Sequence, residues 1–260
     1  MLIFVFALTI SGANSPEAAT LDVMDVGYGS AVHLRTDQGD YLFDVGPRES
    51  SSIVIEHLRA MGVKKIDGVF LSHTHPDHVG GLEPLSQRFS IDRVYWNGVA
   101  GHQPDVLRDL EILKGVTIFV LFRATETVDL GERLTATTVQ TTVSEDDQNE
   151  SSLVVFVRHP KWTLLFPGDA GPKRQKELSR QGLPLRTVRW MLWPHHGDQM
   201  EDKLIELMGN LRYAVVSVGA NPYNMPAVDL ESFSKKHRIT VLRTDKDGPL
   251  RFHLDESIRR

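Results

Sequence analysis

Cysteine is absent from this chain of 260 residues. Its absence excludes disulfide bonds, cysteine nucleophiles and zinc sites built from thiolates. Any metal ion must therefore be held by imidazole and carboxylate groups, which suit zinc, manganese and iron.

A strong excess of charge of one sign is also missing, since the formal net charge is −5 and the isoelectric point is about 6.1. Proteins that coat nucleic acid are usually basic. The balance of charges therefore argues against general DNA binding, but it allows a local basic cleft. A hydrophobic content of 41% and the length of 260 residues fit one α/β domain with a full core.

Long hydrophobic runs are confined to the N-terminus, where Met1 to Ile10 are apolar except for Thr9. This run is too short for a membrane span, which needs about 20 residues. With Ser11-Gly12-Ala13 as a cleavage site, it predicts a signal peptide or an N-terminal tail over residues 1–19, although no Lys or Arg precedes Arg35. A first buried strand or the end of a membrane segment are the alternatives. The folded domain is expected over residues 20–260, exported to the periplasm or the exterior if the signal is real and cytoplasmic otherwise.

Short apolar runs closed by glycine turns alternate with amphipathic segments along the chain. Helices are expected at 51–61, 82–89, 104–113, 172–181, 202–208 and 228–237. Strands are expected at 21–26, 31–35, 41–45, 68–71, 93–96, 116–122, 153–157, 162–166, 188–193, 213–218, 240–243 and 250–254. The polar stretch 143–152 reads as a solvated loop. This mixture predicts an α/β fold with sheet packed on sheet and helices outside.

Three histidines and one carboxylate fall within six residues, at His73, His75, Asp77 and His78, directly after an apolar strand. A sharp turn at a strand end can aim alternate side chains at one point. His73 and His75 then converge on one cation, while Asp77 and His78 face a second. Such a layout leaves coordination positions open for water, as a catalytic metal site requires. Gly80-Gly81 lets the following helix begin close to the metals.

An HxHxDH run after a strand resembles the signature of the metallo-β-lactamase superfamily. More narrowly, the chain resembles the hydrolase domain of the competence protein ComEC and its soluble relatives. The motifs that carry this resemblance lie at 25–31 (DVGYGSA), 43–47 (FDVGP), 73–78, 149–154 (NESSLV), 165–169 (LFPGD), 194–197 (PHHG), 217–223 (SVGANPY) and 243–245 (RTD).

The resemblance implies an αββα sandwich of two mixed sheets with helices on the outside. It also implies one or two divalent metal ions, zinc or manganese. His73 and His75 would bind the first metal, and Asp77 and His78 the second. Asp169 would bridge the two metals. Of the adjacent pair, His196 is expected to be the last ligand, because the superfamily's histidine commonly stands directly before a glycine. His195 would then contact a substrate phosphate or orient a ligand, and an interchange of these two is the alternative.

Several positions depart from the family pattern. Asn149 stands where many superfamily members have another histidine, and as a weak ligand it would favour manganese or loose binding of the first metal. Asp44 would hold a ligand histidine by a hydrogen bond, or serve only as a turn residue. Tyr28 and Ser30 replace the usual Gln and Asp. The segment Asn224-Met225-Pro226 replaces Gly-His-Pro, so one phosphate contact is missing.

The function implied is hydrolysis of a phosphodiester, with DNA as substrate and a metal-activated water that Asp77 orients and deprotonates. A cationic series supports this interpretation, although a solvated helix face also explains it: Arg158, Lys161, Lys173, Arg174, Lys176, Arg180, Arg186 and Arg189. No aromatic ladder for stacking bases is evident nearby.

Hydrolysis of a carboxylic ester, lactone, thioester or β-lactam is the rival enzymatic function. The third alternative is a domain that binds DNA or a protein partner and whose metal site has weakened. Because ComEC's own channel is absent here, two arrangements are open: a free exported hydrolase, or a hydrolase beside a separately encoded membrane channel. No obligate protein partner is evident.

Overall fold

The computed structural model describes residues 19–122, 125–131, 133–139 and 147–260. The predicted signal peptide therefore falls almost wholly outside the described residues. Within the described part of the chain, no helix combines the length and the apolar character that a membrane crossing requires.

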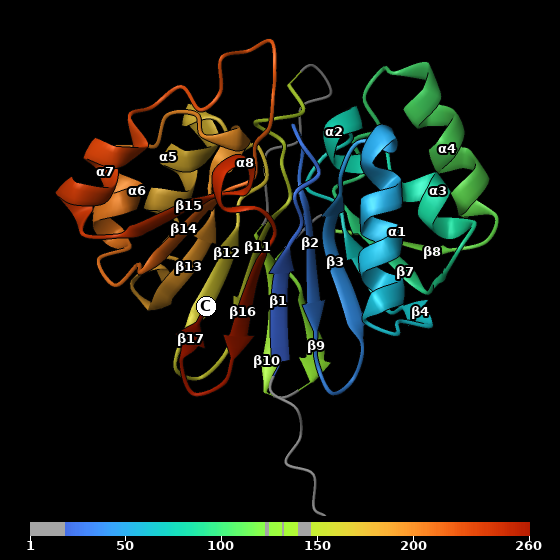
Figure 1. The fold of residues 1–260 in the computed structure, drawn as a ribbon, viewed down its shortest axis with the longest axis horizontal. Coiled ribbons are helices and arrows are strands. Elements are labelled where there is room, and N and C mark those ends of the chain that lie inside the picture. Colours follow the sequence, from blue (N-terminus) through green and yellow to red (C-terminus); the bar gives the residue numbers. More distant parts are fainter. Residues whose placement is uncertain (1–18, 123–124, 132, 140–146) are drawn as a thin grey trace, which may run out of the picture.

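The first sheet has eight strands, in the order β17-β16-β1-β2-β3-β5-β7-β8. Their bounds are β1 Ala19–Val23, β2 Ala31–Arg35, β3 Asp40–Val45, β5 Gly68–Phe70, β7 Arg93–Trp96, β8 Ile118–Leu121, β16 Leu250–Leu254 and β17 Ile258–Arg259. From β3 to β8 the neighbours are parallel, whereas the other pairs are antiparallel. The C-terminal strands thus return to complete the sheet that the N-terminal half begins (Figure 1).

The second sheet has seven strands, in the order β15-β14-β13-β12-β11-β10-β9. Their bounds are β9 Thr127–Gly131, β10 Leu134–Val139, β11 Val154–Arg158, β12 Thr163–Phe166, β13 Val188–Leu192, β14 Tyr213–Val216 and β15 Thr240–Arg243. The pairs from β9 to β12 are antiparallel, and those from β12 to β15 are parallel. A separate parallel pair joins β4 (Lys65–Ile66) to β6 (Ser90–Ile91).

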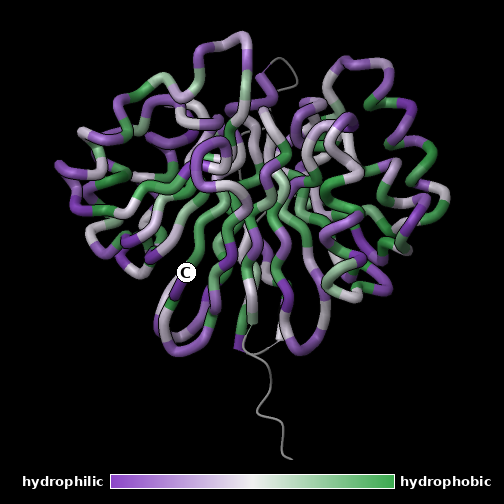
Figure 2. Tube along the Cα trace, in the orientation of Figure 1, coloured by the Kyte–Doolittle hydropathy of each residue, from purple (hydrophilic) through white to green (hydrophobic). Residues whose placement is uncertain are grey.

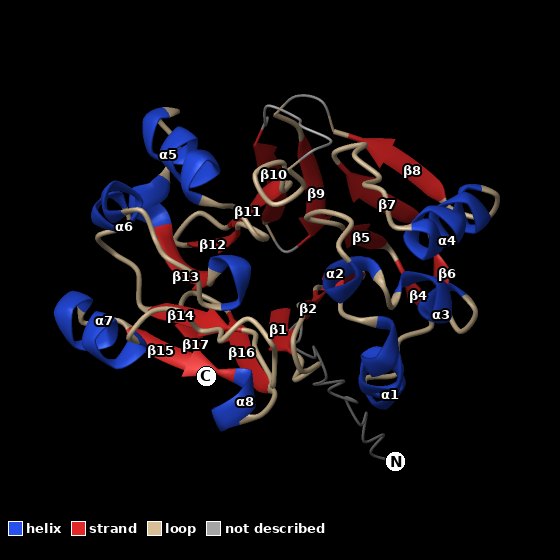
Figure 3. Ribbon diagram, turned by 90° about the horizontal axis from the view of Figure 1, so that it is seen from above, coloured by secondary structure: helices blue, strands red, loops and turns tan. Residues whose placement is uncertain are grey.

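Helices lie on the outer sides of both sheets (Figure 3). Their bounds are α1 Ser51–Ala60, α2 Pro76–Val79, α3 Leu82–Ser86, α4 Pro104–Lys114, α5 Pro172–Arg180, α6 Asp202–Leu207, α7 Leu230–His237 and α8 Thr244–Asp247, with single 3-10 turns at Arg48–Ser50, Leu185–Thr187 and Pro194–His196. Hydrophobic residues concentrate in the central strands, and hydrophilic ones in the outer helices and loops (Figure 2). This arrangement confirms the predicted αββα sandwich of two mixed sheets.

Strand alternation explains the layers. On β3, Phe43 faces the second sheet and Leu42 faces the helices, so each belongs to a different hydrophobic cluster. The Phe43 ring stacks on Phe166 of the opposite sheet, with centroids 3.9 Å apart. Such a pair adds about 1 kcal/mol beyond the burial of its area. The sheets are therefore held together by aromatic packing directly beneath the rim where the loops gather.

Two local expectations are corrected. The hairpin of β9 and β10 was not expected, because Thr127, Thr135 and Thr137 give these strands a polar average that hides their alternation. The predicted solvated loop at 143–152 lies partly outside the described residues. Its described end is solvated only in part, since residues 147–150 are half-buried and Ser151 and Ser152 are fully buried.

Candidate metal centre

The segment from His73 to His78 leaves the end of β5 at the rim of the first sheet. Pro76 begins the short helix α2, a position that suits its fixed backbone angle. The carbonyl of Asp77 accepts the backbone N–H of Ser30 at 3.1 Å. A side chain would not fit at Gly81, because its Cβ would overlap the carbonyl oxygen of Val45. The glycine pair after the histidines thus allows α2 and α3 to lie close against β3 and its following loop.

The first ligand cluster consists of His73, His75 and Asp169, whose ligand atoms all lie within 4.8 Å of one another. Nε2 of His73 is 3.0 Å from Nδ1 of His75 and 3.7 Å from Oδ2 of Asp169. Two nitrogens and one carboxylate oxygen converging in this way form the kind of three-ligand set that leaves a coordination position open.

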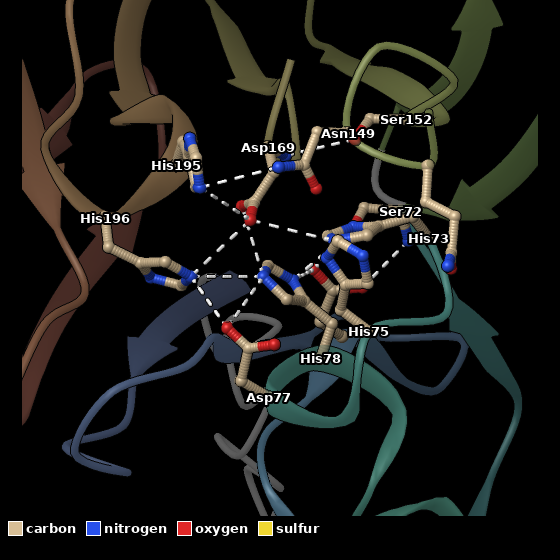
Figure 4. Close-up of polar contacts among 12 residues, drawn as sticks. Ser72, His73, His75, Asp77, His78, Asn149, Ser152, Asp169, His195 and His196 are labelled. Carbon is tan, nitrogen blue, oxygen red and sulfur yellow. Dashed lines mark hydrogen bonds and ion pairs between the residues drawn. The ribbon is translucent and has the colours of Figure 1, made fainter. Parts of the chain in front are cut away.

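The second ligand cluster consists of Asp77, His78, Asp169 and His196. Nε2 of His78 lies 3.2 Å from Nε2 of His196 and 3.1 Å from Oδ1 of Asp169. Oδ2 of Asp77 lies 3.2 Å from Nε2 of His196. Asp169 belongs to both clusters, so its two oxygens are placed to bridge two ions (Figure 4). The structure thus brings together all six predicted metal ligands.

Asp169 follows β12 through Gly168, which has a φ of +59°. A Cβ at Gly168 would lie 2.5 Å from Cβ of Ser72, so a side chain there would push the two rims apart. The backbone N–H of Asp169 donates to Oγ of Ser152 at 3.1 Å. Ser152 belongs to the 149–154 motif that the sequence singled out, and here its hydroxyl holds the backbone of the shared carboxylate.

The adjacent histidines take different places. Nε2 of His196 joins the second cluster, and its Nδ1–H donates to the carbonyl of Ser217 at 2.9 Å. His195 stands outside both clusters, with Nε2 3.9 Å from Oδ2 of Asp169 and Nδ1 3.2 Å from Oδ2 of Asp198. Both histidines have positive φ values, 49° and 54°, a strained conformation often found at functional sites. The structure thus places the two residues as the sequence predicted, rather than interchanged.

Asp44 supports the second cluster from behind. Nδ1–H of His78 donates to Oδ2 of Asp44 at 2.7 Å. Asp44 also accepts the backbone N–H and the hydroxyl of Ser72, each at 2.8 Å. The carboxylate fixes the tautomer of His78, so that its Nε2 lone pair faces the cluster.

The buried carboxylate of Asp169 pairs with imidazole rings from His73, His78, His195 and His196. Burial acts to raise its pKa, but the charge of His78 and the other rings holds the pKa well below the ordinary range. The pKa of His78 is in turn raised, against its burial, chiefly by Asp169 and Asp44. The pKa values of His73 and His75 are instead lowered, chiefly by burial, so these rings stay neutral, as metal-binding imidazoles must be. The residues present therefore fit a pair of divalent ions.

The side chain of Asn149 gives independent support for a metal ion or water bound at the first cluster. Its Oδ1 is buried and has no hydrogen-bond partner among the residues that the structure describes. Its Nδ2 lies 3.5 Å from Nε2 of His195. In Figure 4 the amide oxygen points toward the side of the site where His73 and Asp169 lie. An unpartnered buried oxygen costs free energy unless something binds it, which a metal ion or its water would do.

A cleft of about 560 Å³ opens over the two clusters. Its walls include Tyr28, Gln103, Asn149, His195, Tyr223 and Met225, and its floor includes Asp77 and Asp169. The Tyr28 ring lies 4.5 Å from that of His196 and 5.2 Å from that of Tyr223. Two aromatic rings therefore stand at the cleft, although the sequence showed no aromatic ladder near the cationic series. Both tyrosines belong to noted motifs, but 195 positions separate them in the sequence.

The predicted cationic series does not form one surface near the metals. The parallel strands β12 and β13 end at the site, so residues before them, such as Lys161 and Arg186, lie at the opposite end of the sheet. Arg174 is only 1% exposed and donates to Glu177 and to the carbonyl of Val139. Lys161 pairs with Glu256. Arg174 and Lys161 are thus engaged elsewhere and line no phosphate-binding groove.

Comparison with known proteins places this site in context. A family model described as the metallo-beta-lactamase superfamily matches residues 24–220. The chain is 28% identical to competence protein ComA of Neisseria gonorrhoeae over 91% of its own length and 32% of that protein. It is 24% identical to ComE operon protein 3 of Bacillus subtilis over 95% of its own length and 34% of that protein. The chain thus spans about a third of the length of these curated relatives.

Among solved structures, CmlA, a diiron beta-hydroxylase from Streptomyces venezuelae, superimposes with a TM-score of 0.60 at 15% identity. The superposition covers 92% of this chain and 55% of that one. At this identity the likeness concerns the fold, which supports more than one kind of metal chemistry.

Proposed function

Because this chain belongs to the metallo-beta-lactamase superfamily, we propose that it is a metal-dependent phosphodiesterase that acts on a short nucleotide-containing strand. The observation that carries the proposal is the sharing of Asp169 between two ligand clusters at the floor of one cleft. Divalent ions held there supply activated water near neutral pH and neutralise charge on phosphoryl oxygens.

Asp77 is placed to orient the attacking water. Burial acts to raise the pKa of Asp77, but the charge of His78 and a hydrogen bond from His196 hold it well below the ordinary range. The carboxylate is therefore ionised at neutral pH, and it lines the cleft. It would accept a hydrogen bond from a water molecule there and so orient that water for attack.

His195 is placed to meet the substrate. Its ring is 26% exposed, the largest exposure among the imidazoles that pair with Asp169. Asp198 accepts the Nδ1–H and orients the ring, which leaves Nε2 facing the cleft beside Asn149. From this position the imidazole would form a hydrogen bond with a phosphoryl oxygen or with the leaving oxygen.

Tyr28 and Tyr223 support a nucleotide as the substrate. Tyr223 is 63% exposed, and its ring contacts Tyr28, which in turn contacts the ligand His196. A base stacked on Tyr223 would place its phosphate toward the ligand clusters, and stacking contributes about 1–3 kcal/mol per base. Of the described residues that line the cleft, none is Lys or Arg. Affinity would then depend on the metals and on stacking, which favours a short single strand over a long duplex.

The test compares substrate classes on the same protein. The purified chain, loaded with zinc or with manganese, is assayed on bis-(p-nitrophenyl) phosphate, on nitrocefin and on a lactone. We expect turnover of the phosphodiester alone, with a loss of about 100-fold or more in Asp77→Asn and in His195→Ala. His253→Ala, at an exposed position of β16, is the matched control and should keep full activity.

Two other outcomes contradict the proposal. Turnover of nitrocefin or the lactone without the phosphodiester would assign the site to acyl substrates. No turnover of any substrate with metals fully loaded would indicate a binding domain with a weakened site.

A further inference from the structure

A third group of imidazole and carboxylate side chains lies away from the cleft, between α1 and the first sheet. Asp22 on β1 and His33 on β2 are paired residues of neighbouring antiparallel strands, so their side chains share one face. Their chain neighbours, such as Leu21 and Val32, belong to the core between the sheets. Strand alternation therefore turns Asp22 and His33 outward, where His57 of α1 meets them.

Potential ligand atoms of these three residues all lie within 4.8 Å of one another. Nδ1 of His33 is 3.0 Å from Nε2 of His57, and Oδ2 of Asp22 is 3.6 Å from Nε2 of His57. The nitrogens of His73 and His75 are also 3.0 Å apart, and those of His78 and His196 are 3.2 Å apart. Zinc–nitrogen bonds of about 2.0–2.1 Å at a tetrahedral angle give a similar spacing.

The support behind His33 matches that behind His78. Nε2–H of His33 donates to Oδ1 of Asp40 at 2.8 Å, and Arg35 holds the same carboxylate at 2.7 Å. The tautomer of His33 is thereby fixed, and its Nδ1 lone pair faces His57. A ligand histidine in a metal site almost always donates its other N–H to a carboxylate or carbonyl.

Access and charge also suit a bound ion. A cavity of about 280 Å³ reaches Asp22 and His57 from the surface, so water can complete the coordination. Arg251 binds both oxygens of Asp22, at 2.6 and 3.1 Å, and each oxygen retains further lone-pair capacity. This guanidinium lowers the local attraction for a cation, so an affinity in the micromolar range is expected rather than a tighter one.

We propose that Asp22, His33 and His57 form a third divalent metal site, of the zinc type, that fastens α1 to the first sheet. Its ligands come from β1, β2 and α1, so an ion there links a helix to two strands that are far from it in sequence. The site is separate from the proposed hydrolytic centre and does not depend on it.

The test removes the hydrolytic centre first. The double variant His73→Ala, His196→Ala is dialysed against zinc at pH 7.5, and its metal content is measured. We expect about one zinc ion per chain, and a rise in Tm of about 5 °C when free zinc is one hundred times Kd. Cobalt(II) in the same protein should give the visible absorption of a site with nitrogen ligands.

Adding His57→Gln to that double variant should remove this ion and the rise in Tm, whereas adding His253→Ala should leave both. Asp22→Asn is the second probe and should weaken binding at least 10-fold, which keeps the test decisive if the His57 variant folds poorly. In the otherwise wild-type chain, His57→Gln should retain phosphodiesterase activity. The proposal is overturned if the double variant binds no zinc, since the histidine pair is then only a hydrogen bond. It is equally overturned if His57→Gln leaves the zinc content unchanged.

Discussion

Asp44 and His78 are joined by a hydrogen bond of 2.7 Å from the imidazole Nδ1 to the carboxylate, in the buried layer directly behind the candidate metal centre. The same carboxylate holds the backbone and hydroxyl of Ser72 at the end of β5. One residue of β3 therefore fixes both the position of the ligand segment and the tautomer of one of its histidines. The first sheet thus fixes the local geometry of the segment that carries His73 to His78.

Replacing Asp44 tests this support. Asp44→Asn keeps the size of the side chain but removes the charge that orients His78, so metal affinity should fall about 10- to 100-fold. Competition dialysis against a chelator measures that change, with His253→Ala as the control. An unchanged affinity would mean that His78 is held by the rest of the fold.

The position of Asn149 beside the first cluster predicts that a histidine there would strengthen zinc binding. Its unpartnered Oδ1 lies beside the first cluster, and an imidazole is a stronger zinc ligand than an amide. Asn149→His should therefore raise zinc affinity about 10-fold or more, and Asn149→Ala should lower it. Titration with a zinc-competing dye distinguishes the two variants. Equal affinities in both would show that the amide oxygen binds no metal.

The proposed stacking on Tyr223 predicts that its removal weakens the binding of substrates that carry a base. Removing an exposed ring that stacks a base should raise KM for thymidine 5′-(p-nitrophenyl phosphate) about 10-fold, while kcat changes little. Methyl p-nitrophenyl phosphate, which lacks the base, should show a smaller effect. Tyr223→Phe keeps the ring and should behave like the wild type. Equal losses on both substrates in Tyr223→Ala would contradict the stacking role.

His57 predicts how the stability of the metal-free protein depends on pH. Burial and the neighbouring His33 lower the pKa of His57 to about 4. Arg251 and Arg35 act in the same direction, and Asp22 acts against them. In the unfolded chain a histidine titrates near pH 6.5, so the unfolded state takes up the proton first as the pH falls. The folded state should therefore lose on the order of 2 kcal/mol between about pH 6.5 and pH 4, after allowance for solvent screening.

Urea unfolding at pH 7.5 and pH 4.5 measures this loss. His57→Gln should show a smaller loss than the wild type, because its side chain does not titrate. His253→Gln, exposed on β16, should lose as much as the wild type. Identical losses in wild type and His57→Gln would contradict the assigned shift.

The sequence predicted those parts of the site that depend on residues adjacent in the chain or on short motifs. His73, His75, Asp77 and His78 are adjacent along the chain, and Asp169 and His196 stand in recognisable motifs at strand ends. Contacts made only by the folded chain were not predicted. Examples are the contact of Tyr28 with Tyr223 and the approach of His57 to His33, since both depend on how distant elements pack.

The cationic series failed for a related reason. Its residues are close in sequence, but Lys161 and Arg186 come before strands that run toward the rim, whereas Arg174 lies on the helix that follows one of them. Whether a charged side chain lies near the metal centre depends on the direction of its strand, and the amino-acid composition does not reveal that direction. Arg174 shows this most clearly, because it is charged and yet fully enclosed beside Glu177 and Val139.

The central claim is that one carboxylate joins two metal sites. A crystal structure of the zinc-loaded protein, with anomalous data at the zinc edge, measures this directly. Within the cleft we predict two peaks about 3.5–4 Å apart on either side of Asp169, apart from any zinc ion bound by Asp22, His33 and His57. One should be bound by His73 and His75, and the other by Asp77, His78 and His196. Two fully occupied zinc ions with Asp169 bound to neither would contradict the account.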